Sequence, residues 1–543
     1  MEIEKISNEQ YEMFWADQIA KEIISRNKYH FINRKIPKFG EFVVKTSASL
    51  SGVLHIGRLS DTIRGDSVHK ALKDAGVKSK LIWVAEDMDP LRSIPQGVAK
   101  RFEDNIGMAV TDVPDPEGCH KSYAEHFTSQ YFKVLDDFVH TKMQKFSMRA
   151  EYKKGSFKPY IKKILDKVNE VIEIQNNYRS APLRQDWSPW MPVCDNCGKI
   201  VTPRITGFAN KKVLYVCKDY SFEKYTAHGC NYEGENNPLK GNGKLVWKSE
   251  WAAQWARWKV VSEGAGKEYQ VPNSAFWING EITEKIFDYP APVPIFYEHV
   301  LIDNVKMSAS IGNVIYPYEW LDVASPELLR MFYNKRLMKA RSFSWKDLPN
   351  LYDEYDYYGK VYFGEIMLEN KKEEGHIKRL FKISHIGEIK KPVDTSFSHT
   401  ALLAQLFTKK SDIVNSLKKT GHYRKEQEKQ IFQRISYVKN WLAKYAPEEV
   451  RIKVNDAVPK NLDLNEKEKE ALHITARALK EEDFDEKTLF ERFYSICQEL
   501  GLDPKYFFRA SYKVIMNRDR GPKLAPFILT IGKEKVIKLF EKV

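Results

Sequence analysis

The sequence of 543 residues lacks any long hydrophobic run, and no stretch approaches the ~20 consecutive apolar residues that cross a bilayer. Its first residues, MEIEKISNEQYEMFW, lack the basic and then apolar pattern of a secretory signal. Internal repeats and low-complexity tracts are also missing. We therefore expect a cytoplasmic protein that does not engage membranes.

Cysteine is scarce, with six residues in the whole chain, which is too few for a disulfide framework. Four of them lie close together in the sequence: Cys194, Cys197, Cys217 and Cys230. This spacing resembles a structural zinc ribbon, in which four thiolates leave the metal no open position. His228 remains an alternative to Cys230 as fourth ligand, and four reduced, separately buried cysteines remain an alternative to zinc. We predict that the isolated Cys119 and Cys497 are packing residues.

Acidic residues are outnumbered, because 73 aspartates and glutamates face 87 lysines and arginines, for a net charge of +14. This excess favours a polyanionic partner such as nucleic acid, although solvated lysine faces produce part of such an excess in some proteins. The hydrophobic fraction of 43% is enough for sizeable cores. A chain of this length exceeds a single core, so we expect roughly three or four domains.

The first part of the chain alternates helical and strand-like patterns. Residues 8–30 have apolar positions at helical spacing, and the strand-like segments 41–48 and 81–85 flank a helix that we expect to end near residue 75. This order predicts an α/β fold with a parallel, Rossmann-type sheet. We expect residues 292–302 to return to that sheet as a strand.

We divide the chain into five segments on these patterns. They are a first half of the sheet domain (1–150), a helical and cysteine-bearing insertion (151–250), the second half of the sheet domain (251–305), a small domain that begins with a loop (306–394), and an all-helical C-terminal domain (395–543).

Two short motifs indicate a nucleotide site. In LSGVLHIGRLSDTIRGD, His55 and Gly57 stand where a helix begins after a strand, which suits a phosphate-bearing ligand, although a capping or core histidine would fit the same pattern. The loop KMSASIGN supplies Lys306 and the hydroxyls of Ser308 and Ser310 just beyond the last strand. These groups suit a clamp on a pyrophosphate leaving group, whereas an ordinary solvated loop is the alternative.

The two motifs, in this order, resemble the HIGH and KMSKS motifs of class I aminoacyl-tRNA synthetases. Longer segments are similar to class I lysyl-tRNA synthetases over nearly the whole chain. They are FWADQIAKEII at 14–24, SLSGVLHIG at 49–57, DVPDPEGCHKSYAEHF at 112–127, LYDEYDYYGKVYFGE at 351–365 and FFRASYKVIMNRDRGPKLAPFILTIGKEKVIKLF at 507–540.

The resemblance implies a lysine–tRNA ligase that forms lysyl-adenylate from lysine and ATP with Mg²⁺, needs tRNA for this activation, and transfers the lysine to tRNA(Lys). It also implies that segment 306–394 is a stem-contact-like domain and that segment 395–543 binds the anticodon. We expect a monomer with a structural zinc ion. The alternatives are a class I synthetase for another amino acid such as glutamate, or a non-catalytic tRNA-binding paralogue.

The resemblance assigns roles residue by residue. The residues that it assigns to catalysis are His55, Gly57, Lys306, Ser308 and Ser310. It places ATP against Ser49, Gly52, His55, Gly57, Arg58, Lys306 and Met307. The clamp departs from the family pattern, because Ala309 and Ile311 stand where lysines are often found. We hypothesise that the Arg58 guanidinium compensates by binding a phosphate.

An acidic stretch, AEDMDPLRSIP, follows the second expected strand and places Glu86, Asp87 and Asp89 at the carboxyl end of the sheet. Such carboxylates suit a cationic substrate or a metal, although an exposed acidic turn is the alternative. By resemblance, the lysine pocket also includes Ser47, Ser49, Trp247 and Tyr269. Ser47, Ser49 and Tyr269 replace the Gly, Thr and His more frequent in the family, so one hydrogen-bond donor or some pocket volume changes.

The C-terminal helices carry basic residues interleaved with aromatics. Arg518, Arg520 and Lys523 lie in a turn marked by Gly-Pro, where they suit RNA phosphates. The aromatic run Tyr506 to Phe508 is more typical of a core than of a base-stacking platform.

Overall fold

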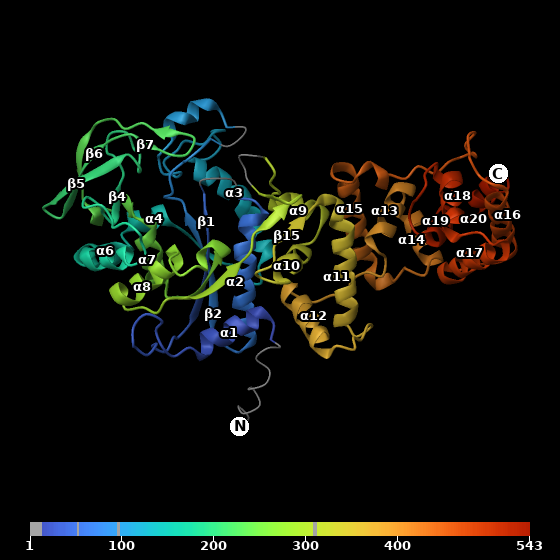
Figure 1. Cartoon of the computed structure of the whole chain (residues 1–543), viewed down its shortest axis with the longest axis horizontal. Coiled ribbons are helices and arrows are strands. Elements are labelled where there is room, and N and C mark those ends of the chain that lie inside the picture. Colours follow the sequence, from blue (N-terminus) through green and yellow to red (C-terminus); the bar gives the residue numbers. More distant parts are fainter. Residues whose placement is uncertain (1–12, 51–53, 95–97, 308–311) are drawn as a thin grey trace, which may run out of the picture. The chain divides into compact units, whose positions relative to one another are not determined.

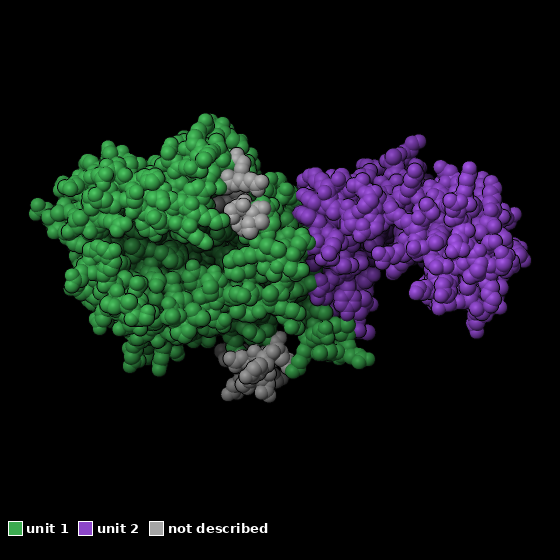
Figure 2. All heavy atoms as spheres, turned by 45° about the horizontal axis from the view of Figure 1, so that its top comes forward, with its two compact units in different colours: residues 1–321, 326–343, 368–389 green, residues 322–325, 344–367, 390–543 purple. Residues whose placement is uncertain are grey.

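The computed structural model describes residues 13–50, 54–94, 98–307 and 312–543. The chain forms two compact units, coloured separately in Figure 2. Unit 1 contains residues 1–321, 326–343 and 368–389, and unit 2 contains residues 322–325, 344–367 and 390–543. Among the described helices, none combines the length and the apolar character needed to cross a membrane. The division into five segments remains a prediction.

A five-stranded sheet in which all neighbours are parallel forms the centre of unit 1 (Figure 1). Its strands, in spatial order, are β12 (Val293–Tyr297), β11 (Val260–Gly266), β1 (Phe42–Ser49), β2 (Ser79–Glu86) and β3 (Gln144–Ser147). Every residue of β11 is buried, as expected where helices cover both faces of a parallel sheet. The predicted α/β fold with a parallel sheet is confirmed.

The order of the strands reverses at the centre of this sheet. The chain passes from β1 through α2 (Ile56–Asp74) to β2 on one side, and from β11 through α8 (Ala275–Phe287) to β12 on the other. Because such crossovers are right-handed, the two helices cover opposite faces. In open α/β sheets, ligands bind outside the carboxyl ends of the strands at this reversal. The topology therefore points to the ends of β1 and β11.

Helices complete the layers of unit 1. On one side α1 (Trp15–Ser25) packs on α2, and on the other α7 (Trp247–Trp258) packs on α8 and β11. The side chains of Val84, Val260, Trp255 and Phe276 join the sheet and these helices in one hydrophobic core. Further helices of the unit are α3 (Tyr123–Leu135), α9 (Pro317–Val323, of which 322–323 belong to unit 2), α10 (Pro326–Asn334) and α12 (Lys371–Ser384).

The expectation that residues 292–302 form one strand of the central sheet is wrong in its second half. After β12, the backbone N–H of Glu298 donates to the carbonyl of Leu337, and β13 (Val300–Ile302) pairs with β14 (Val305–Lys306) and β15 (Arg341–Phe343) in a separate sheet. This exchange of partners turns the chain away from the central sheet just before the second motif.

The region between β3 and α7 contains helices followed by small antiparallel sheets. The helices are α4 (Met148–Lys154), α5 (Lys158–Asp166) and α6 (Val168–Asn176). The strands are β4 (Trp190–Pro192), β5 (Pro203–Ala209), β6 (Lys212–Cys217), β7 (Tyr220–Ser221), β8 (Thr226–Ala227), β9 (Glu233–Asn236) and β10 (Gly243–Leu245). The sheets β5-β6-β9 and β7-β8 bring the four clustered cysteines onto returning strands and turns.

Unit 2 is helical, as predicted for the C-terminal part. Its helices are α11 (Leu348–Tyr362), α13 (Phe397–Leu406), α14 (Lys410–Lys419), α15 (Glu428–Lys444), α16 (Glu466–Glu481), α17 (Glu486–Leu500), α18 (Pro504–Met516), α19 (Leu524–Ile531) and α20 (Lys533–Phe540). The Arg434 guanidinium binds both carboxylate oxygens of Asp356 at 2.6 and 2.7 Å in a buried pair that ties α15 to α11.

Candidate active site

His55 is the N-cap of α2, at the reversal of the sheet. Its Nδ1 accepts a hydrogen bond from the backbone N–H of Gly57 at 3.1 Å. Burial, together with the smaller effect of the nearby Arg58, lowers the pKa of His55 to about 4. The imidazole is therefore neutral near pH 7, and because Nδ1 accepts, the ring proton lies on Nε2. This N–H is a donor available to a bound anion at a helix N-terminus.

The two motifs meet although they lie about 250 residues apart in the sequence. The side chain of Met307 packs on Gly57, and a Cβ added at Gly57 would lie 2.7 Å from Met307 Cε and 2.8 Å from His55 Cε1. The backbone N–H of Ile56 also donates to the carbonyl of Ile315 at 2.9 Å. A side chain at position 57 would therefore have to displace the Met307 methyl or the His55 ring, and glycine allows the two motifs to pack closely.

An open cavity of about 620 Å³ lies at the carboxyl ends of β1 and β11. The site residues predicted from the sequence that line it are Ser47, Ser49, His55, Gly57, Arg58, Glu86, Asp89, Trp247, Tyr269, Lys306 and Met307. Lys306 and Arg58 are exposed at this cavity, whereas Met307 is buried. Gly52, Ser308, Ser310, Ala309 and Ile311 lie outside the described residues.

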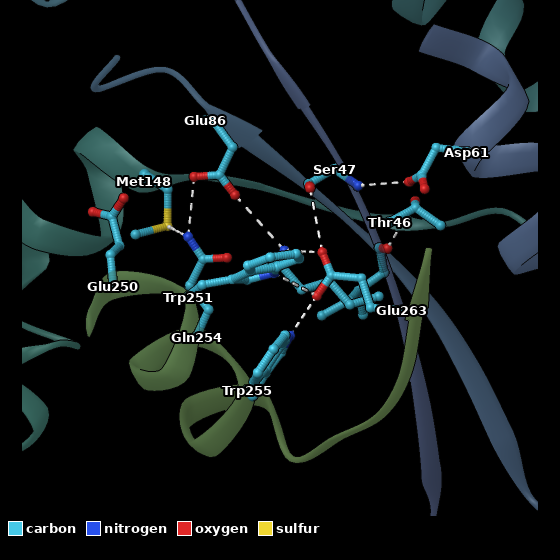
Figure 3. A network of polar contacts seen from close by, with 12 residues as sticks. Thr46, Ser47, Asp61, Glu86, Met148, Glu250, Trp251, Gln254, Trp255 and Glu263 are labelled. Carbon is cyan, nitrogen blue, oxygen red and sulfur yellow. Dashed lines mark hydrogen bonds and ion pairs between the residues drawn. The ribbon is translucent and has the colours of Figure 1, made fainter. Parts of the chain in front are cut away.

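The floor of this cavity contains a buried carboxylate held by two tryptophans (Figure 3). Glu263 of β11 accepts hydrogen bonds from Trp251 Nε1 at 2.9 Å and Trp255 Nε1 at 2.5 Å. Its other oxygen accepts from Lys45 Nζ at 2.6 Å and lies 3.4 Å from Ser47 Oγ. Buried charges need such partners, and this network fixes the middle of β11 against β1.

Glu86 has a weaker set of partners than Glu263. Its Oε2 accepts from Gln254 Nε2 at 3.0 Å, but its buried Oε1 accepts no hydrogen bond from the described residues and lies 3.7 Å from Lys45 Nζ. Burial raises the pKa of Glu86 to about 8; Lys45 opposes this rise, and the neighbouring Glu250 adds to it. A cationic ligand would favour the ionised form of this carboxyl.

Other acidic groups add to the negative character of the cavity. Burial raises the pKa of Asp61 to about 6, and its carboxylate accepts from the Ser47 N–H at 3.3 Å and the Tyr297 hydroxyl at 3.2 Å. Asp89 accepts from Ser49 Oγ at 2.6 Å and from the buried Lys244 at 3.0 Å.

Aromatic rings form one wall of the cavity. Trp247 stacks on Trp251 with ring centroids 4.8 Å apart, and Tyr269 meets Trp251 edge to face at 5.4 Å. Rings beside carboxylates suit an ammonium group on a hydrophobic stem, because the stem packs on the rings and the charge meets the carboxylates. This wall of the cavity therefore favours a cationic group over an anionic one.

Asp87 differs from its neighbours Glu86 and Asp89, because it does not line the cavity. Its carboxylate accepts from the backbone N–H of Arg149 at 2.8 Å, in the first turn of α4, and burial raises its pKa to about 6. The assignment of Asp87 to substrate binding is therefore corrected to a role in anchoring α4.

Sequence reasoning missed several residues at the cavity. Asp61, Trp251 and Glu263 line it, and Lys45, Lys244 and Glu250 form buried ion pairs beside it. The available signal was a charged residue inside an apolar strand, as in VVSEGAG and FVVKTSAS, because such a residue requires a buried partner.

The four clustered cysteines converge. Their sulfur atoms all lie within 4.8 Å of one another, with 3.7 Å between Cys194 Sγ and Cys230 Sγ and 3.6 Å between Cys197 Sγ and Cys217 Sγ. Ligands at ~2.3 Å from a tetrahedral zinc ion lie about 3.8 Å apart, so the donor set fits zinc. His228 is exposed and interacts with Asp219 at 3.3 Å instead, which leaves Cys230 as the fourth candidate ligand.

A second group with metal-ligating side chains was not predicted. Asp115, Cys119, His120 and His126 bring one ligand atom each to within 4.8 Å of one another. Cys119 Sγ lies 3.0 Å from His120 Nδ1 and 3.3 Å from His126 Nδ1. The expectation that Cys119 is a packing residue is wrong, because its side chain is exposed, whereas Cys497 is buried as expected.

A parallel sheet whose reversal carries a His-x-Gly helix start, with a Lys-Met segment packed on that glycine, is the arrangement of class I aminoacyl-tRNA synthetases. The profile of the family described as tRNA synthetases class I (K) matches residues 13–387, and the chain belongs to this family. The predicted family and the predicted enzyme class, an aminoacyl-tRNA ligase, are confirmed.

Relatives match along nearly their full lengths. The lysine–tRNA ligases of Methanocaldococcus jannaschii and Pyrococcus furiosus are each 32% identical to this chain; the alignments cover 97% and 96% of it and 99% and 98% of the relatives. The lysine–tRNA ligase of Methanosphaera stadtmanae is 29% identical, with 97% and 98% covered. A solved glutamate tRNA ligase from Elizabethkingia meningosepticum has a TM-score of 0.36 and 12% identity over 92% of this chain and 98% of that chain, too low to bear on the assignment.

Proposed function

We propose that this chain is a lysine–tRNA ligase that activates lysine with ATP and transfers it to tRNA(Lys). The observation that carries the choice of amino acid is Glu86, a buried carboxyl at the cavity with one oxygen that accepts no hydrogen bond from the described residues. An ammonium group of lysine supplies the missing donor. A glutamate substrate would instead bring its carboxylate beside Glu86, Asp61 and Glu263, which disfavours the glutamate alternative.

The geometry supports distinct roles for the two motifs. The Nε2–H of His55 binds an α-phosphate oxygen, where negative charge grows as the lysine carboxylate attacks. Lys306, with Ser308 and Ser310, holds the leaving pyrophosphate. Mg²⁺, when bound with ATP, neutralises phosphate charge. These groups act by position and charge, because adenylate formation needs no covalent help from the protein.

Charging of unfractionated tRNA with each of the twenty amino acids, in the presence of ATP and Mg²⁺, tests this function. We expect lysine alone to be attached, and we expect ATP–pyrophosphate exchange with lysine only when tRNA is present. Charging with another amino acid would keep the class and overturn the pocket assignment. A chain that binds tRNA but neither ATP nor lysine would be the non-catalytic paralogue.

The hypothesis that Arg58 compensates for the lysines that the 306–313 clamp lacks can be tested by substitution. Replacement of Arg58 by alanine is expected to raise the KM for ATP about 10-fold, because a hydrogen bond to a charged phosphate is lost. Arg58→Lys keeps the charge but lacks the paired donors of the guanidinium. Its KM for ATP should therefore lie between those of the wild type and Arg58→Ala. Steady-state aminoacylation at varied ATP measures the effect, and an unchanged KM in Arg58→Ala would remove this role.

A structural zinc ion at Cys194, Cys197, Cys217 and Cys230 is the metal we propose for the insertion. Purified protein is expected to contain zinc by elemental analysis, and Cys217→Ser should lose one equivalent and lower the melting temperature. Any zinc that remains in Cys217→Ser would be bound by another group, such as the one around Cys119. The variant Cys119→Ser tests that group in the same way. Full zinc retention in Cys217→Ser would contradict the four-cysteine site.

A further inference from the structure

Unit 2 contains two hydrophobic cores that share one helix, α13 (Figure 1). The first core, with Leu403 and Ile413 among its members, joins α13 to α14 and α15. The second core, with Leu402 and Leu489 among its members, joins α13 to the helices from α16 to α20. The neighbours Leu402 and Leu403 thus enter different cores, and α13 lies at the junction between them.

Two histidines and a glutamate meet at this junction. His399 lies on α13, His422 lies in the turn after α14, and Glu486 is the first residue of α17. Each side chain brings one ligand atom to within 4.8 Å of the other two, and all three are at least partly buried. The rings of the two histidines are nearly perpendicular, with centroids 5.2 Å apart. Segments from both cores therefore contribute to one group of ligand atoms.

The facing atoms of His422 and Glu486 lack hydrogen bonds. His422 Nδ1 and Glu486 Oε1 are buried and lie 3.5 Å apart, yet neither takes part in a hydrogen bond with the residues that the structure describes. Ligands at ~2.1 Å from a tetrahedral zinc ion lie about 3.4 Å apart, so this spacing suits a metal ion bound to both. Buried polar atoms without partners cost free energy, and coordination would supply the missing interaction.

The donor set is typical of zinc, because two imidazole nitrogens and a carboxylate oxygen leave a fourth position for water. Calcium and magnesium prefer sites built from oxygen alone. Burial and the nearby His422 lower the pKa of His399 to about 4, so this imidazole keeps a lone pair near pH 7. Burial raises the pKa of Glu486, Asp485 adds to the rise, and His422 and Lys523 oppose it. A bound cation would favour the ionised carboxylate.

We propose that His399, His422 and Glu486 bind one Zn²⁺ ion, which ties α17 to α13 and to the turn after α14 and so holds the two cores of unit 2 together. This site is separate from the four-cysteine site and from the reaction proposed for unit 1. Because it has three protein ligands and is partly exposed, we expect a chelator to remove its zinc before that of the four thiolates.

Cobalt titration of the full-length protein tests the metal site. The protein is dialysed against EDTA until the easily removed metal is gone, and Co²⁺ is then added. The wild type should bind one equivalent that shows visible d–d absorption without a thiolate-to-cobalt charge-transfer band. Glu486→Gln and His422→Gln should weaken this binding about 100-fold or more, since even loss of an outer-shell partner costs 10–100-fold.

The matched control is His473→Gln. His473 is a half-buried histidine of α16 and belongs to none of the metal-ligating groups formed by the described part of the chain. This variant should bind Co²⁺ as the wild type does. All variants are compared in melting temperature without metal, so that a general loss of stability is recognised.

Hydrogen exchange shows where the metal acts. Zn²⁺ should slow the exchange of backbone amides in residues 397–406 and 486–500 of the wild type, and it should have no such effect in Glu486→Gln. Absence of this protection in the wild type, or equal Co²⁺ binding by Glu486→Gln, His422→Gln and His473→Gln, would overturn the proposal. The charging assay is a separate readout, so a failure of the proposed function would leave this result unchanged.

Discussion

Replacement of His55 by alanine is expected to lower kcat for aminoacylation about 100-fold to 1000-fold, the range for loss of one donor to developing negative charge. The donor is the Nε2–H, since Nδ1 is committed to the Gly57 N–H. The same change removes the N-cap of α2 and should lower the free energy of unfolding by about 1 kcal/mol. Steady-state charging and denaturant unfolding measure the two effects separately.

His55→Asn separates capping from catalysis. Asparagine caps a helix and carries an amide donor, so this variant should recover the stability and only part of kcat. Because burial lowers the pKa of His55 to about 4, its ionisation should not appear in the kcat profile between pH 6 and 8. The stability linked to neutral His55 is present above the unfolded pKa near 6.5 and declines as the pH falls toward 4. A His55→Ala enzyme within threefold of wild-type kcat would refute the donor role.

Replacement of Glu86 by glutamine is expected to raise the KM for lysine about 30-fold or more, because the carboxylate that meets a substrate ammonium is lost, at a cost of about 2 kcal/mol or more. Glutamine keeps an oxygen that can accept from Gln254, so the local packing is preserved. The KM for ATP should change little. Lysine-dependent charging at saturating ATP and tRNA measures the effect.

Asp87→Asn is the matched control, because Asp87 is the neighbouring buried carboxyl and lies outside the cavity lining. It should leave the KM for lysine near the wild-type value.

The pH dependence of the KM for lysine gives a second test. In the free protein Glu86 holds its proton up to a pKa of about 8, and lysine binds the ionised form, so the wild-type KM for lysine should fall as the pH rises from 6 to 8. Glu86→Gln should be flat over this range, and a flat wild-type profile would contradict the assignment.

The different positions of Glu86 and Asp87 show where sequence reasoning stopped. β2 ends at Glu86, and Asp87 and Asp89 lie in the turn that follows, where strand alternation no longer sets which side a carboxylate takes. The sequence gives no sign of which side holds the cavity. That depends on β11, which pairs with β1 from more than 200 residues away and brings Trp251, Trp255 and Glu263 with it.

The two groups of metal-ligating side chains in unit 1 also differ in how far the sequence predicts them. The spacing of the four clustered cysteines was a sufficient local signal for their convergence, and the choice of Cys230 over His228 depended on the turn at Gly229. A Cβ added at Gly229 would lie 2.5 Å from the Lys218 backbone, so only glycine allows this close return of the chain. The group around Cys119 was missed because its spacing matches no common zinc pattern and because the side chains meet only once Asp115 has bound the N–H groups of Glu117 and His120.

The sequence by itself determined the helix start at His55, the alternation of strands and helices, the cysteine cluster and the family. These are local patterns, in which hydrophobic period, capping and spacing act within a few residues or turns. Only the tertiary structure decided that Met307 closes on Gly57, that Glu86 faces the cavity while Asp87 anchors α4, and that Lys45 neutralises Glu263. Each of these depends on buried charges and close backbone approaches between distant segments, whose free energy is set by the partner that the fold supplies.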